Sequence, residues 1–124
     1  MPEKIAVLQN LLHELHSSPE VEAAAVVRRD GILIAGSLPE GVDSKSVAAM
    51  TAAIVGTAEQ SAITLNRGAF RQVIIEADKG KIVSIGIGPL ALLSCLVRPS
   101  ANLGLVLLQM NKIGDKMKAE LKEE

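Results

Sequence analysis

Two histidines, His13 and His16, have a spacing that suggests metal chemistry, because side chains three positions apart share one side of a helix. They offer two nitrogen ligands, whereas a structural zinc ion needs about four. The single cysteine, Cys95, lies far along the chain, and the spacing differs from the i, i+4 histidines of zinc-dependent proteases. We interpret the pair as helix-end histidines, which the helix dipole favours, and expect no metal site.

Cys95 paired with a histidine is the candidate for nucleophilic catalysis. It lies in the apolar run Leu92–Leu96, where a free cysteine usually behaves as a small buried apolar group. The sequence shows no base that would be oriented toward the thiol. We therefore predict a structural role for Cys95 and no enzymatic activity.

The segment Gly86-Ile87-Gly88 superficially resembles a phosphate-binding loop. It lacks the lysine and the Ser or Thr of such a loop, and no helix is expected to begin after it. We interpret the segment as a turn next to a strand, and we expect no bound cofactor.

The composition describes a compact globular chain that gives no reason to expect nucleic-acid binding. Its 124 residues fit one domain, residues 1–124. The net charge is −1, and Phe70 is the single aromatic residue, so the stacking groups of single-strand binders are missing. A lone cysteine suits a reducing compartment, and the sequence has neither a signal-peptide pattern nor a membrane-length apolar run. We expect a cytoplasmic protein with no membrane insertion.

The first and last helices are predicted from apolar spacing. Residues 3–16 place Ile and Leu at intervals of three and four, and this helix ends before Pro19, which disfavours helical geometry in the residue before it. The last helix is expected to begin near Ala101, and its charged end, from Lys112, is expected to be solvated.

Five short β-branched runs separated by glycine-containing turns predict an antiparallel sheet. Asp30-Gly31 is a strong hairpin signal of the type I′ turn, which requires positive φ at both positions. The order of elements is helix, strand, strand, helix, three strands, helix, which is an α+β fold with a five-stranded antiparallel sheet and three helices. The predicted strands are residues 21–29, 32–35, 70–76, 81–87 and 91–97.

The middle helix, predicted for residues 45–65, is apolar in an unusual way. Asp43 or Ser44 can cap its start, and Gly68 is a plausible left-handed stop. Residues 47–56 contain a single polar side chain, and their apolar groups point in every direction around the helix. A small domain has little material to cover both sides of such a helix, so we predict that a second copy of the chain covers it. The alternative is that alanine merely favours the helix and tolerates water.

Taken together, these segments resemble the Roadblock family, which includes dynein light chains and the bacterial and archaeal regulators of small Ras-like GTPases. Its hallmarks here are the first hairpin (residues 25–35), the alanine-rich helix (48–59), the turn into the last strand (88–93) and the start of the last helix (101–104). The charged C-terminus is more similar to the bacterial and archaeal regulators than to the shortest light chains. The resemblance implies a Roadblock/profilin-like sandwich.

The resemblance also implies a dimer. Two sheets would join through the third strand, about residues 70–77, with two antiparallel middle helices across the joined sheet. Five arginines could contact a partner, and one way to accelerate a GTPase is to supply an arginine in trans; the sequence does not select among Arg28, Arg29, Arg67, Arg71 and Arg98. The expected dimer contacts are Val47, Met50, Ile54, Phe70, Val73 and Ile75, and the expected partner contacts are Thr51, Arg67 and Arg71.

The functional prediction is a non-catalytic homodimeric platform that binds a small Ras-like GTPase and modulates its GTP hydrolysis or its localisation. Two alternatives remain open: a small-molecule-sensing module, and a scaffold subunit without a GTPase partner. A sensor would need a pocket with convergent polar groups, of which the apolar strands offer few.

Overall fold

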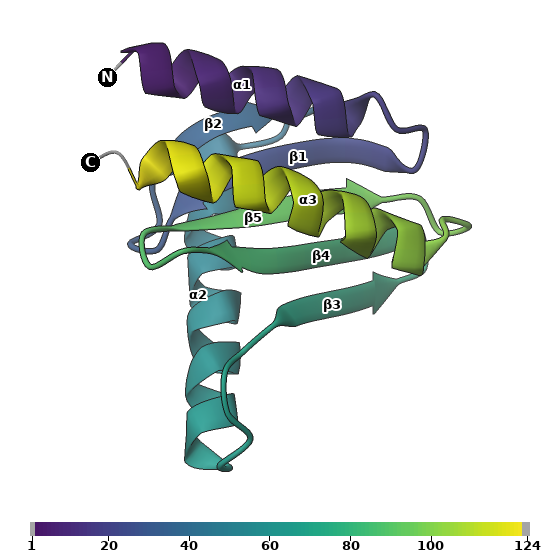
Figure 1. Cartoon of the computed structure of the whole chain (residues 1–124). Helices are drawn as coiled ribbons and strands as arrows, with labels where there is room; N and C mark the ends of the chain where they lie inside the picture. The colour runs from purple at the N-terminus through teal and green to yellow at the C-terminus, as the bar shows by residue number, and fades with distance from the viewer. Residues whose placement is uncertain (1, 123–124) are drawn as a thin grey trace.

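The computed structural model describes residues 2–122 and confirms the predicted α+β fold and order of elements. Five strands form one antiparallel sheet in the order β2-β1-β5-β4-β3. Helices α1 and α3 lie side by side on one face, and α2 crosses the opposite face roughly perpendicular to the strands (Figure 1). The elements are α1 (Pro2–His16), β1 (Val21–Arg28), β2 (Leu33–Ser37), α2 (Ser44–Thr64), β3 (Gln72–Ala77), β4 (Gly80–Ile87), β5 (Ala91–Val97) and α3 (Leu103–Leu121).

The main core fills the space between the sheet and the pair α1 and α3. The apolar spacing of α1 produces it directly, since Leu8, Leu12 and Leu15 recur on one helix face and are all buried. Alternation in the central strands supplies the other half of this core, because successive side chains of a strand point to opposite faces. The strand and α3 residues in this core include Ala24, Val26, Val83, Ile85, Leu93, Cys95, Val106, Met110, Ile113 and Met117.

A second, smaller core lies under α2 and consists of small side chains. Ala25 and Val27 of β1 pack there with Ala48 of α2. The start of α2 is fixed by Asp43, whose carboxylate accepts hydrogen bonds from the Lys45 N–H (3.2 Å) and from the Ser46 hydroxyl (2.7 Å). Asp43 is therefore the N-cap of α2, which was one of the two residues predicted for this role.

Two turn predictions were wrong in their details. In the β1–β2 hairpin only Gly31 has positive φ, whereas a type I′ turn needs it at Asp30 as well. The Gly31 N–H donates to the Arg28 carbonyl (2.9 Å), and the Arg28 N–H donates to the Ile32 carbonyl (2.8 Å). These bonds enclose a three-residue loop, which accommodates one left-handed residue at its end.

The end of α2 also differs from the prediction. The left-handed residue next to the helix is Asn66 (φ 57°), which follows the cap residue Leu65, while Gly68 lies two residues further on. Asparagine tolerates this conformation better than other side chains do, so the helix ends before the glycine is reached. The last helix likewise begins later than expected, at Leu103, because Asn102 caps it by accepting from the Leu105 N–H (3.1 Å).

Candidate protein-interaction surface

Helix α2 is buried along one narrow seam. Ala48, Thr51 and Val55, spaced by three and four residues, are its buried side chains. The neighbouring flank is apolar but open, since Met50 is 56% exposed and Ile54 is 39% exposed. The middle helix is thus covered by its own sheet on one side, while its second apolar flank faces outward.

A groove runs between this open flank and the sheet, and we call it the α2 groove. It has a volume of about 230 Å³, and its lining is almost wholly apolar. Among the described residues, three polar side chains line it: Thr51 of α2, and Ser84 and Ser94 on the sheet, whose hydroxyls lie 2.9 Å apart across β4 and β5. Its lining includes Val47, Met50 and Ile54 of α2, Ala23 of β1, Ile75 of β3, Ile82 of β4, Leu96 of β5, and Leu38, Pro39 and Val42 of the preceding loop.

Strand β3 forms the edge of the sheet beside this groove. In the described part of the chain it pairs with β4 alone, so its outer row of backbone groups has no partner strand. Ile75 lines the α2 groove, and alternation places Val73 on the same face. Both side chains are half-buried, as is Phe70 just before the strand. An open edge next to an apolar groove is a surface suited to pairing with another chain.

The structure brings most of the expected dimer residues together. Val47, Met50, Ile54 and Ile75 line one groove, and Val73 shares their face of the sheet. Whether a second chain contacts them stays a prediction. The groove also contains apolar residues that were not predicted to line it, among them Val42 (43% exposed), Ile82 (38% exposed), Leu38 and Leu96. Ile82 could have been identified from strand alternation. Its neighbour Val83 is buried on the face covered by α1 and α3, so Ile82 points to the opposite face, toward α2.

The expected partner contacts are divided between the interior and the surface. Thr51 lies in the buried seam of α2 at 7% exposure, and it also lines the α2 groove, so a partner would reach it only through that groove. Arg67 and Arg71 are both exposed and lie in the connection between α2 and β3. They remain predicted contacts for a second protein.

The residues first considered for chemistry have ordinary surroundings. His16 is bonded through Nδ1 to the Ser37 hydroxyl (2.6 Å), and within residues 2–122 no group of three or more His, Cys, Asp or Glu side chains could hold a metal ion. Cys95 is buried, as predicted, and burial raises its pKa to about 12, so the thiol stays protonated at neutral pH. Among the described helices, none is both long and apolar enough to cross a membrane.

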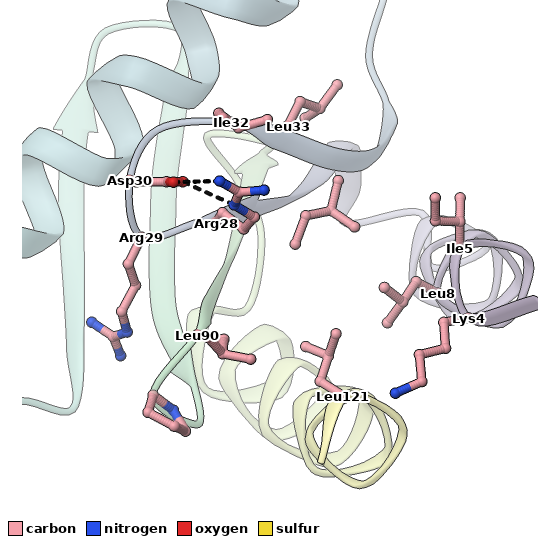
Figure 2. A pocket seen from close by; sticks show the side chains of 12 residues that line it. Lys4, Ile5, Leu8, Arg28, Arg29, Asp30, Ile32, Leu33, Leu90 and Leu121 are labelled. Carbon is pink, nitrogen blue, oxygen red and sulfur yellow. Dashed lines mark hydrogen bonds and ion pairs between the residues drawn. The ribbon is translucent and has the colours of Figure 1, made fainter. Parts of the chain in front are cut away.

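A second hollow, of about 690 Å³, opens between α1, the β1–β2 hairpin, the β4–β5 turn and the end of α3. Figure 2 shows Leu8, Leu90 and Leu121 approaching it from three of these elements. Arg28 and Asp30, on its rim, are bonded to each other; this ion pair lowers the pKa of Asp30 and raises that of Arg28. The Arg29 guanidinium is bonded to Glu59 of α2. The charges of Arg28, Arg29 and Asp30 are therefore paired within the protein.

Comparison with known proteins agrees with this architecture. The family profile described as Roadblock/LC7 domain matches residues 7–97. "Uncharacterized protein MJ0310" of Methanocaldococcus jannaschii is 34% identical over 113 residues, which cover 91% of this chain and 98% of the relative.

Solved structures show the same fold. MglB of Myxococcus xanthus superimposes with a TM-score of 0.89 at 20% identity, over 96% of this chain and 90% of that chain. Profilin IB of Acanthamoeba castellanii superimposes with a TM-score of 0.66 at 15% identity, over 91% of this chain and 98% of that chain. The fold is therefore of the Roadblock/profilin type.

Proposed function

The chain belongs to the Roadblock/LC7 family, and we propose that it acts as a homodimeric, non-catalytic platform for a small Ras-like GTPase. The observation that carries the proposal is the α2 groove next to the open edge of β3. Family membership supports the class of partner, and the groove supports the way in which two chains would assemble to receive it.

The groove favours a second copy of the same chain as its first occupant. Met50, Ile54, Val42 and Ile82 are each more than a third exposed on one face, and covering apolar area stabilises an assembly by roughly 25 cal/mol per Å². Two β3 edges in antiparallel register would satisfy each other's free backbone groups. The same two-fold arrangement would lay the open flank of one α2 against that of the other.

The exposed surface of such a dimer would then meet the GTPase. Arg67 and Arg71 lie in the connection that leads from the end of α2 to the start of β3, the edge strand through which two sheets would join. Positive side chains beside an apolar platform would steer and orient a partner, with more effect on association rate and register than on affinity. Modulation of GTP hydrolysis would follow from holding the GTPase's own catalytic residues in place.

Two measurements test the proposal in order. Light scattering after size exclusion should give twice the 13.0 kDa chain mass at micromolar concentration. The tagged dimer is then incubated with a native cell extract containing either GDP or a non-hydrolysable GTP analogue, and captured proteins are identified by mass spectrometry. Enrichment of one Ras-like GTPase in a nucleotide-dependent way is the expected result. A dimer that captures other proteins but no GTPase would favour the scaffold alternative.

The sensing alternative has one observation in its favour, the hollow of about 690 Å³ beside α1. Its hairpin charges are already bonded within the protein, which leaves few polar groups to orient a ligand. We therefore rank this function below the GTPase platform.

A further inference from the structure

We infer that Arg29 is a positioning residue that fixes the direction of α2 at the point where this helix leaves the sheet. Because the α2 groove is walled by that helix, its shape depends on the same contact. The link to dimer formation rests on the proposed function, whereas the effect on α2 itself does not.

Arg29 joins three segments that are distant in sequence. Its Nη1 donates to both carboxylate oxygens of Glu59, at 2.7 and 2.6 Å, and its Nη2 donates to the Gly88 carbonyl at 3.0 Å. Its backbone N–H donates to the Leu90 carbonyl at 3.0 Å. One loop residue after β1 thus ties α2 to the β4–β5 turn.

Glu59 lies just beyond the part of α2 that is buried against the sheet. Val55 is the last buried residue of the helix, and Glu59 follows it by one turn. Figure 1 shows the second half of α2 extending away from the strands that its first half crosses. Among the described side chains of α2 after Val55, Glu59 is the one with a hydrogen bond or ion pair to another element. The ion pair with Arg29 is therefore the last polar side-chain contact between α2 and another element before the helix ends.

Gly86 provides separate evidence that the Arg29 guanidinium has a fixed position. Its backbone is outside the positive-φ region, so its conformation alone does not require glycine. A Cβ built there would lie 2.9 Å from Arg29 Nη2, which is closer than real Cβ contacts come. An alanine at this position would push the guanidinium away. The missing side chain of Gly86 thus makes room for Arg29.

The chemistry of the contact suits positioning more than stability. The two side chains are 29% and 32% exposed, and ion pairs this accessible to water contribute little to folding. The guanidinium offers donors in several directions within one rigid plane, so it can hold a carboxylate and a carbonyl at once. Lysine, a point charge on a flexible stem, cannot fix both directions in the same way.

The test is amide hydrogen exchange of residues 56–64, measured at a dilution where light scattering gives the monomer mass. The variants are Arg29→Met, Glu59→Gln and Gly86→Ala, the last of which retains every charge. We expect exchange about fivefold faster in all three, with unchanged far-ultraviolet circular dichroism. Arg28→Met is the matched control, because the Arg28 side chain, at the end of β1, is bonded within residues 2–122 only to Asp30 of the adjoining loop. Arg29→Lys should give an intermediate rate.

A second measurement links the contact to assembly. The dimer dissociation constant should rise about fivefold in Arg29→Met and Gly86→Ala and stay unchanged in Arg28→Met. Unchanged exchange in all three test variants would overturn the inference. If the wild-type protein never dimerises but exchange is faster in the three variants than in the wild type, the positioning role is supported and the proposed platform is rejected. If Arg29→Met unfolds, Gly86→Ala and Glu59→Gln still decide the question.

Discussion

Ile54 of α2 and Ile75 of the edge strand β3 line the same apolar groove from its two sides. Ile54 is 39% exposed in the single chain, and Ile75 is half-buried. The relationship matters because it joins the two features predicted to form the dimer, the apolar helix and the open strand edge, into one continuous surface. A second chain that pairs with β3 would also reach Ile54.

The first prediction concerns this surface. Ile54→Asp should convert the dimer to a monomer without unfolding it, because an unpaired charge buried at an interface costs several kcal/mol, whereas Ile54 reaches solvent in the single chain. Light scattering and circular dichroism measure the two effects. Ile63→Asp is the control, since Ile63 is 63% exposed and outside the groove. A dimer that tolerates Asp at position 54 would place the interface elsewhere.

The second prediction is a stoichiometry of one GTPase per dimer. A partner centred on the two-fold axis would contact both subunits and cover the equivalent site. Isothermal titration calorimetry, with the GTPase loaded with a non-hydrolysable GTP analogue, should give one GTPase per two chains. A ratio of two per dimer would instead indicate binding at each outer edge.

The third prediction assigns the partner contact to Arg67 and Arg71. Reversing both charges, Arg67→Glu with Arg71→Glu, should weaken GTPase binding about tenfold or more and leave the dimer mass unchanged, because both side chains are exposed. Added salt should weaken wild-type binding as well. Arg98→Glu is the control: Arg98 is exposed but follows the end of β5, at the opposite end of the strands from the start of β3. Binding unaffected by the double reversal would contradict the assignment.

The fourth prediction is that Cys95 is structural. Its side chain is 1% exposed and burial raises its pKa to about 12, so a thiol reagent should not modify the native protein at neutral pH but should modify the unfolded chain. Cys95→Ser should cost roughly 1–3 kcal/mol in urea unfolding, since it buries a hydroxyl that needs a bond.

The reagent control for that experiment is Ser100→Cys, at an exposed position that should react at once. Dimer formation and GTPase binding should survive in Cys95→Ser. Lost binding at full stability would indicate a role for the thiol.

The fifth prediction concerns acid. The Ser46 hydroxyl and then the Lys45 N–H, both bonded to Asp43, lower its pKa below the ordinary 3.8. The unfolded chain therefore binds this proton more readily than the folded chain does. The stabilisation is fully present above 3.8 and is lost as the pH falls through the lower folded value. Asp43→Asn keeps an acceptor but does not titrate, so its thermal midpoint should fall less steeply with acid.

The matched variant for this comparison is Asp78→Asn, which is exposed in the β3–β4 turn. It also removes one carboxylate, but from an exposed turn and without changing a helix cap. Identical acid profiles for Asp43→Asn and wild type would show that the cap does not contribute to acid sensitivity.

Local sequence patterns were enough for most of the fold. The leucines of α1 recur with the helical period, and Asp43 caps α2 through atoms within three residues of itself. Such signals act over one or two turns of chain, so they can be read without knowing what the element packs against. The turn at Asp30 was misread because its geometry depends on the offset between two strands: β1 and β2 shift register between Val26 and Val27.

The site depended on contacts that no local pattern encodes. The apolar excess of α2 predicted a further partner, but only the packing decided that Thr51 lies inward and that Ile54 lies outward. The ion pair between Arg29 and Glu59 joins residues 30 positions apart. The sequence by itself determined the elements, because periodicity and capping are local energies. The tertiary structure decided which side chains share a groove, because helix direction and strand order are set by contacts between distant segments.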